Sequence, residues 1–181
     1  MIDTCSRFTY CNEKITHERN KRQCGGGSIM IWGMIMPNGL ITIKQMIGRQ
    51  TLEKYIHLLS TFAVPIMNLN LEPGYNFVQD NCSIHVSKLS RQFLQNQSFN
   101  VLEWPSRSPD INIMENIWKM ISDIVYEERQ PQNIIELKEN IHNAVLKINK
   151  ENILKTKGLY TSFRERLTRI LISKGNMFCS Q

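Results

Sequence analysis

The chain has 181 residues, of which 41% are hydrophobic and 21% are charged, and its formal net charge is +6. This length and apolar content predict one folded domain and exclude a disordered chain. The absence of a bilayer-length apolar run or a leader peptide predicts a soluble, intracellular protein with no membrane partner. The basic balance favours a polyanionic partner such as DNA, although a solvated basic surface would give the same charge.

A polar and irregular segment is expected at the beginning of the chain, over residues 1–24. Cys5, Cys11, His17 and Cys24 lie in this segment, but their spacing matches no common zinc module. We therefore expect unpaired thiols in a reducing compartment and not a metal site.

A hairpin is predicted to follow. The apolar run 29–36 is bounded by Gly and Pro, which is typical of a buried strand, and residues 40–44 form a second apolar run. Asn38 and Gly39 stand between the two runs, and this dipeptide favours the tight turns of hairpins.

Helices and strands should then alternate. A helix capped by Thr51 is expected to be interrupted at Pro65. Apolar spacing predicts the remaining elements, which are a strand over 75–79, a helix carrying Leu89, Phe93 and Leu94, a strand over 99–104, and three helices that begin near Asn112, near Ile134 and before Phe163. This order predicts an α/β fold in which helices cover a mixed sheet.

Two carboxylates occupy positions suited to chemistry. Asp80 directly follows the predicted strand 75–79, where α/β folds commonly place ligands. Glu115 lies in the first turn of the helix that begins near Asn112, away from its apolar stripe. If the fold brings them together, they form an oxygen-rich site that suits Mg²⁺ or Mn²⁺.

Each of these residues also has a structural explanation. Glu115 is three residues after Asn112, so the pair resembles a capping box, and a Glu near a helix N-terminus also suits the helix dipole. Asp80 would satisfy backbone amides after the strand, and His85 would be a structural histidine.

Three blocks of the sequence resemble the Tc/mariner superfamily of transposases. They are Gly-Gly-Gly-Ser-Ile-Met-Ile-Trp-Gly over 25–33, Gln-Asp-Asn with His85 over 79–85, and Trp-Pro-x-x-Ser-Pro-Asp-x-Asn-x-x-Glu-Asn-x-Trp over 104–118. The 34 residues between Asp80 and Glu115 equal the spacing in the branch whose third acidic residue is Glu.

This resemblance implies a ribonuclease-H-like DDE domain over residues 25–181 that cleaves and transfers DNA strands in transposition. Asp80 would be the second acidic residue and Glu115 the third, and together they would hold two Mg²⁺ or Mn²⁺ ions. DNA would be the substrate, with no small-molecule substrate. The resemblance also implies a nuclear location and a homodimer.

The chain departs from the family pattern near its beginning. Asp3 is the nearest counterpart of the first acidic residue and metal ligand, but its sequence context is altered and only two residues precede it. We therefore expect the first strand to be missing or incomplete, and activity to be impaired. The helix-turn-helix region that would recognise transposon ends has no counterpart in the sequence.

The alternative is a catalytically inactive, transposon-derived remnant with a nucleic-acid-binding or interaction role. Its DNA affinity would come from basic residues, although most of these would equally form a solvated surface. They are Lys88, Arg91, Arg107, Arg164, Arg166 and Arg169.

Overall fold

The computed structural model describes residues 2–9, 27–80, 82–102 and 112–172, and within these ranges five strands form one mixed sheet with the order β3-β2-β1-β4-β5. The strands are β1 (Ile2–Thr9), β2 (Ser28–Ile35), β3 (Ile41–Met46), β4 (Asn76–Gln79) and β5 (Asn100–Leu102). The pairs β1–β2 and β2–β3 are antiparallel, whereas β1–β4 and β4–β5 are parallel. The predicted mixed sheet is confirmed.

Strand β1 lies at the centre of this sheet. Each of its 8 residues pairs with β2, beginning with Ile2 opposite Ile35. On its other side, within the described residues, β1 pairs with β4 through Ile2 and Asp3, and Asp3 lies opposite Gln79.

The first strand, which we expected to be missing or incomplete, is present over residues 2–9, so these residues do not belong to the irregular segment predicted over 1–24. We expected the strand to precede Asp3, whereas Asp3 lies inside it. The local sequence of β1 has only a weak strand pattern. The strand is stabilised by its hydrogen-bonded pairing with β2, and such long-range pairing cannot be predicted from a local pattern. Residues 10–24 lie outside the described residues.

Strand β2 is buried on both faces, because its side chains alternate between two hydrophobic cores. Ile29, Ile31 and Ile35 belong to one core. Trp32 and Met34 belong to the other. A strand that is buried on both faces has apolar residues at consecutive positions, and this strand was predicted from such a run.

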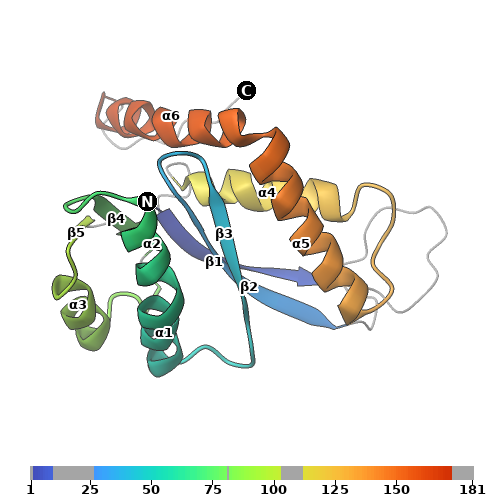
Figure 1. Cartoon of the computed structure of the whole chain (residues 1–181), viewed down its shortest axis with the longest axis horizontal. Helices are drawn as coiled ribbons and strands as arrows, with labels where there is room; N and C mark the ends of the chain where they lie inside the picture. Colours follow the sequence, from blue (N-terminus) through green and yellow to red (C-terminus); the bar gives the residue numbers. More distant parts are fainter. Residues whose placement is uncertain (1, 10–26, 81, 103–111, 173–181) are drawn as a thin grey trace.

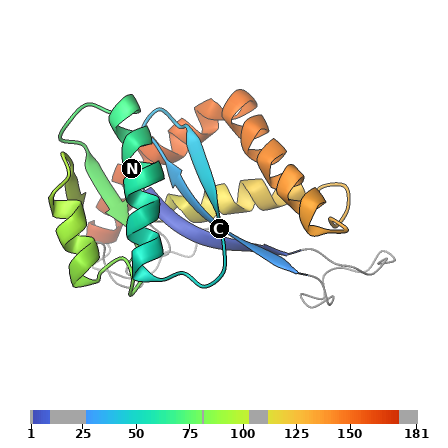
Figure 2. The same cartoon turned by 60° about the horizontal axis from the view of Figure 1, so that its bottom comes forward.

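Each core is closed by its own layer of helices, and Figures 1 and 2 show one layer on each side of the sheet. The green layer contains α1 (Leu52–Leu58), α2 (Val64–Asn70) and α3 (Lys88–Gln95). The yellow-to-red layer contains α4 (Ile113–Val125), α5 (Ile134–Glu151) and α6 (Ile153–Ile172). The predicted arrangement of helices on the sheet is confirmed.

The interruption predicted at Pro65 takes the form of an irregular helical turn, and the helix continues beyond it. A π-helical turn, η1 (Leu59–Ala63), joins α1 to α2, and Pro65 lies in the first turn of α2. Proline lacks an N–H and its ring crowds the carbonyl one turn earlier. A wider turn just before Pro65 gives the ring room, so the chain bends without leaving the helical path.

The C-terminal helices are fastened to the β2–β3 hairpin by side chains. The Asn149 Nδ2 group of α5 donates to the Ile41 carbonyl at 2.9 Å, and its Oδ1 accepts from the Ile41 N–H at 2.9 Å. The Thr156 hydroxyl of α6 donates to the carbonyl of Gly39 at 2.8 Å. Gly39 has a φ of 90° in the predicted turn. These bonds satisfy backbone groups at the outer edge of β3.

Replacing Asn149 by Leu should lower the free energy of unfolding by about 1–3 kcal/mol, because the N–H and C=O of Ile41 would lose their partners. Chemical denaturation of both proteins measures this change. Asn143→Leu, an exposed position on the same helix, is the matched control and should be near neutral. Equal midpoints for the two variants would contradict the role given to Asn149.

Candidate active site

Asp80 is placed by strand β4, which ends one residue before it. Phe77, Val78 and Gln79 are all buried, so the strand is fixed on both faces, and the Asp80 side chain keeps 36% of its surface exposed. The predicted position of this carboxylate at the carboxyl end of a buried strand is confirmed.

Among the described residues, two hydrogen bonds reach the carboxylate of Asp80, and both end on Oδ1. The Nδ1 atom of His85 is 2.6 Å from Oδ1, and the backbone N–H of Cys82 donates to the same oxygen at 3.0 Å. Burial raises the pKa of Asp80, but hydrogen bonding and attraction from His85 together with the Cys82 N–H outweigh it and lower the pKa below its usual value. Asp80 is therefore an anion at neutral pH, as a metal ligand must be.

A buried polar network lies behind His85, which is itself 2% exposed. The Tyr55 hydroxyl donates to Oε1 of Gln79 at 2.6 Å, and Nε2 of Gln79 donates to the His85 carbonyl at 3.1 Å. The rings of Tyr55 and His85 are 4.3 Å apart and inclined by 30°. This network was not predicted, because Tyr55 fits the apolar stripe of its helix in the sequence.

Glu115 lies in the first turn of α4, and its side chain is exposed. Asn112 caps this helix as predicted, since its Oδ1 accepts from the Met114 N–H at 3.1 Å. Among the described residues, the Glu115 carboxylate has no recorded hydrogen bond to Asn112 or to Asp80. The cap therefore works without the second half of a capping box, and Glu115 is left available for another role.

The approach of α4 to the sheet depends on Gly33. This glycine pairs with Thr4 of β1, and a Cβ atom built on it would lie 2.5 Å from Cη2 of Trp118 and 3.2 Å from Cε of Met114. Because Gly33 has no side chain, the indole of Trp118 packs directly against the backbone of β2. Glu115 is one helical turn before Trp118, on a helix that contacts both β1 and β2.

The third predicted ligand is placed through its backbone alone. Asp3 lies opposite Gln79, the residue before Asp80, and its side chain is outside the described residues. Within the described ranges no three His, Cys, Asp or Glu side chains gather around one point. In the structure, Asp80 is hydrogen-bonded to His85, and the backbone of Asp3 lies beside β4. The site formed by three carboxylates stays a prediction.

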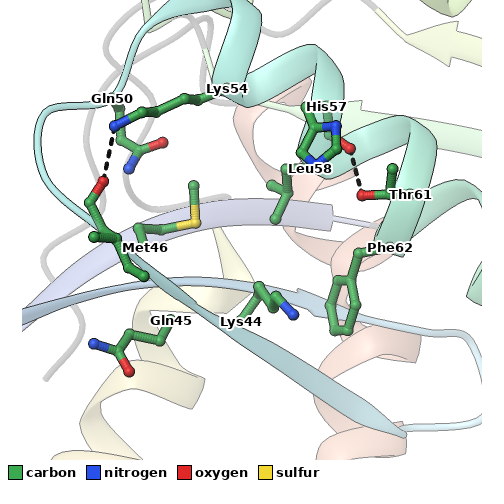
Figure 3. A pocket seen from close by; sticks show the side chains of 10 residues that line it. Lys44, Gln45, Met46, Gln50, Lys54, His57, Leu58, Thr61 and Phe62 are labelled. Atoms are coloured by element: carbon green, nitrogen blue, oxygen red, sulfur yellow. Dashed lines mark hydrogen bonds between the residues drawn. The ribbon is translucent and has the colours of Figure 1, made fainter.

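A hollow of about 400 Å³ lies between β3 and the helix α1–η1 (Figure 3). The Nζ atom of Lys54 crosses one end and donates to the carbonyl oxygens of Ile47 and Arg49 at 3.0 and 3.2 Å. Its lining has no carboxylate or thiol and so does not suit a divalent cation. It consists of Lys44, Gln45, Met46, Ile47, Gln50, Lys54, His57, Leu58, Thr61 and Phe62.

Comparison with known proteins decides the family. Residues 5–138 match the model of the DDE superfamily endonucleases. The chain is 31% identical over 158 residues to the Tc3 transposase of Caenorhabditis elegans, and 34% identical over 97 residues to the Tcb1 transposase of Caenorhabditis briggsae. The chain belongs to the DDE endonuclease superfamily, in its Tc/mariner branch.

The solved structures of this branch share the fold. The DDE domain superimposes on the crystal structure of the catalytic domain of Mos1 mariner transposase with a TM-score of 0.72 at 15% identity, which covers 98% of this chain and 84% of that one. For the Mos1 transposase paired-end complex with left transposon end, the TM-score is 0.80 at 15% identity, covering 98% and 56% of the two chains. The predicted ribonuclease-H-like fold is confirmed.

The matched segments cover 87% of this DDE domain and 47% of the Tc3 transposase, and 52% of the domain and 35% of the Tcb1 transposase. The domain therefore spans about half, or less, of the curated relatives that it matches. Among its described helices, none combines the length and the apolar character that crossing a bilayer requires.

Proposed function

We propose that this chain is the catalytic domain of a DNA transposase that cleaves and transfers DNA strands with the help of divalent metal ions. The observation that carries the proposal is the position of the Asp80 carboxylate in the sheet. Asp80 stands at the end of β4, one residue beyond the point where β4 pairs with Asp3 of the central strand. The Mos1 structures include paired-end complexes with Mn and with Mg, which supports the same metals here.

Asp80, Glu115 and Asp3 are the residues proposed to hold two Mg²⁺ or Mn²⁺ ions. Ions bound there would supply Lewis-acid stabilisation of the attacking and leaving oxygens of the phosphodiester. The protein's own part is to present ionised carboxylates on rigid elements. The hydrogen bonds to Asp80 fix its orientation, and the close packing of Trp118 on Gly33 fixes the first turn of α4.

DNA is the proposed substrate, and a homodimer and a nuclear location are proposed with it. Lys88 and Arg91 are exposed on α3, the helix that follows Asp80, and are placed to attract phosphates. Arg166 has a structural bond, since its Nη1 atom donates to Oδ1 of Asn116 at 3.2 Å. The side chains of the other basic residues singled out from sequence lie outside the described residues.

The inactive DNA-binding remnant is the second candidate, and it is not favoured. One support for it was the expectation that the first strand is missing or incomplete, and a strand is present as β1 at the centre of the sheet.

A DNA nicking assay tests the proposal. The chain should cleave supercoiled DNA in Mn²⁺ and not in EDTA, and Asp80→Ala should reduce cleavage to background. Binding of DNA without metal-dependent cleavage would favour the remnant, and cleavage that survives Asp80→Ala would place the chemistry elsewhere. The fold of each variant is verified by its circular dichroism spectrum.

A further inference from the structure

We propose that Tyr55 is a positioning residue of this domain. Acting through Gln79 and His85, it holds Asp80 so that Oδ1 is occupied by hydrogen bonds and Oδ2 is the oxygen that binds the metal. This inference rests on the proposed function, in which Asp80 is a metal ligand. Tyr55 lies outside the sequence blocks from which the site was predicted, 24 positions before Gln79 along the chain.

The first step is the orientation of the Gln79 side chain. An amide carries an acceptor at one end and two donors at the other. Because the Tyr55 hydroxyl donates to Oε1 at 2.6 Å, the amino end points away from the ring and donates to the His85 carbonyl at 3.1 Å. Tyr55 is 1% exposed and Gln79 is 6% exposed, so solvent does not replace either bond.

The second step is the placement of His85. Its carbonyl is held by Gln79, and its ring lies 4.3 Å from the Tyr55 ring at an inclination of 30°. Tyr55 therefore constrains His85 in two ways. Its hydroxyl orients Gln79, which binds the His85 carbonyl, and its ring lies against the His85 ring. This fixes Nδ1 at 2.6 Å from Oδ1 of Asp80, and Nδ1 is the donor because an ionised carboxylate only accepts.

The third step is the choice between the two oxygens of Asp80. Oδ1 accepts from both His85 and the Cys82 N–H, and each carboxylate oxygen has two lone pairs to offer. Among the described residues, no hydrogen bond to Oδ2 is recorded. The structure therefore assigns Oδ2 to the cation, with Oδ1 held by partners behind it in the manner of metal sites generally.

Manganese affinity tests the role of Tyr55. The dissociation constant is obtained from the electron paramagnetic resonance signal of free Mn²⁺, with the full 181-residue chain. Tyr55→Phe keeps the ring and removes the hydroxyl, and it should weaken Mn²⁺ binding by about 10-fold, as loss of an outer partner does at other metal sites. DNA affinity in EDTA should not change.

Tyr75→Phe is the matched control. The Tyr75 hydroxyl is also buried in the core on the Tyr55 side of the sheet, but it has no hydrogen-bond partner among the described residues. The same chemical change should therefore leave Mn²⁺ affinity as it is. A general effect of losing a buried hydroxyl would move both variants together and would overturn the proposal.

The route through Gln79 is tested by a double-mutant cycle. If Tyr55 acts through Gln79, then Tyr55→Phe combined with Gln79→Met should bind Mn²⁺ no more weakly than Gln79→Met alone. Additive effects, or wild-type affinity in Tyr55→Phe, would overturn the inference.

Asp80→Asn separates this failure from failure of the proposed function. Loss of Mn²⁺ binding in Asp80→Asn with none in Tyr55→Phe would refute only the positioning role. Unchanged binding in Asp80→Asn would refute both.

Discussion

Replacing Glu115 by Gln should reduce metal-dependent DNA cleavage by roughly three orders of magnitude, while the unfolding midpoint stays unchanged. Loss of one ligand charge costs about 4 kcal/mol of transition-state stabilisation, and each 1.36 kcal/mol is a factor of about ten in rate. Stability should not respond, because the Glu115 side chain is exposed and has no recorded bond among the described residues. Nicking rates in Mn²⁺ and thermal unfolding measure the two effects.

Glu136→Gln is the matched control, because Asn133 and Glu136 repeat the Asn-x-x-Glu pattern of Asn112 and Glu115 at the first turn of α5. Here the carboxylate is structural. It pairs with Arg129 at 2.5 Å and accepts from the Gln132 N–H at 2.6 Å. Glu136→Gln should cost about 1 kcal/mol of stability and leave cleavage unchanged.

The reverse pattern would contradict the site. If Glu115→Gln lowered stability and spared cleavage, Glu115 would be the capping residue that the sequence equally allowed.

Replacing Gly33 by Ala should destabilise the domain by about 1–3 kcal/mol and also reduce cleavage. The added methyl group would lie 2.5 Å from the Trp118 ring, which is 5% exposed and has no room to withdraw. Moving α4 outward would shift Glu115, and small displacements of catalytic groups are costly. Thermal unfolding should show a fall of about 2–4 °C for each kcal/mol lost.

Gly158→Ala in α6 is the control for this substitution. No atom lies within 4 Å of a Cβ atom built there, so Ala should stabilise the helix by about 0.5–1 kcal/mol. Trp118→Phe should restore part of the stability and cleavage of Gly33→Ala, since it removes the ring atoms that clash. Failure of this rescue, or a neutral Gly33→Ala, would show that α4 does not depend on close contact with β2.

Local chemistry was sufficient to predict much of the fold. The turn at Asn38 and Gly39 and the caps at Thr51 and Asn112 depend on residues within three or four positions of each other. Strand β1 was not predictable in the same way, because it is stabilised by pairing with a strand about 20 residues further along the chain and by a parallel ladder to β4.

In the candidate site, too, the features that depend on local sequence were predicted and those that depend on long-range contacts were not. Asp80 and Glu115 were found because each belongs to a contiguous pattern at the start or end of an element. The network behind Asp80 was missed, because Tyr55 and Gln79 are 24 positions apart in the sequence. One signal was present in the sequence, since a Gln at the end of a buried strand needs hydrogen-bond partners from elsewhere. Gly33 was noticed as part of a motif, and its contact with Trp118 required coordinates.

The two hydrogen bonds between Asn149 and Ile41 affect how these molecules associate with one another at high concentration. Strand β3 is the last strand of the sheet on its side, and such a strand normally offers its free backbone groups to any extended peptide. Here the amide of Asn149 already occupies both groups at one end, and Lys44 places a charge further along. A peptide that added to this edge would first have to displace the Asn149 amide from Ile41, so these two hydrogen bonds disfavour β-augmentation at the Ile41 end of the strand.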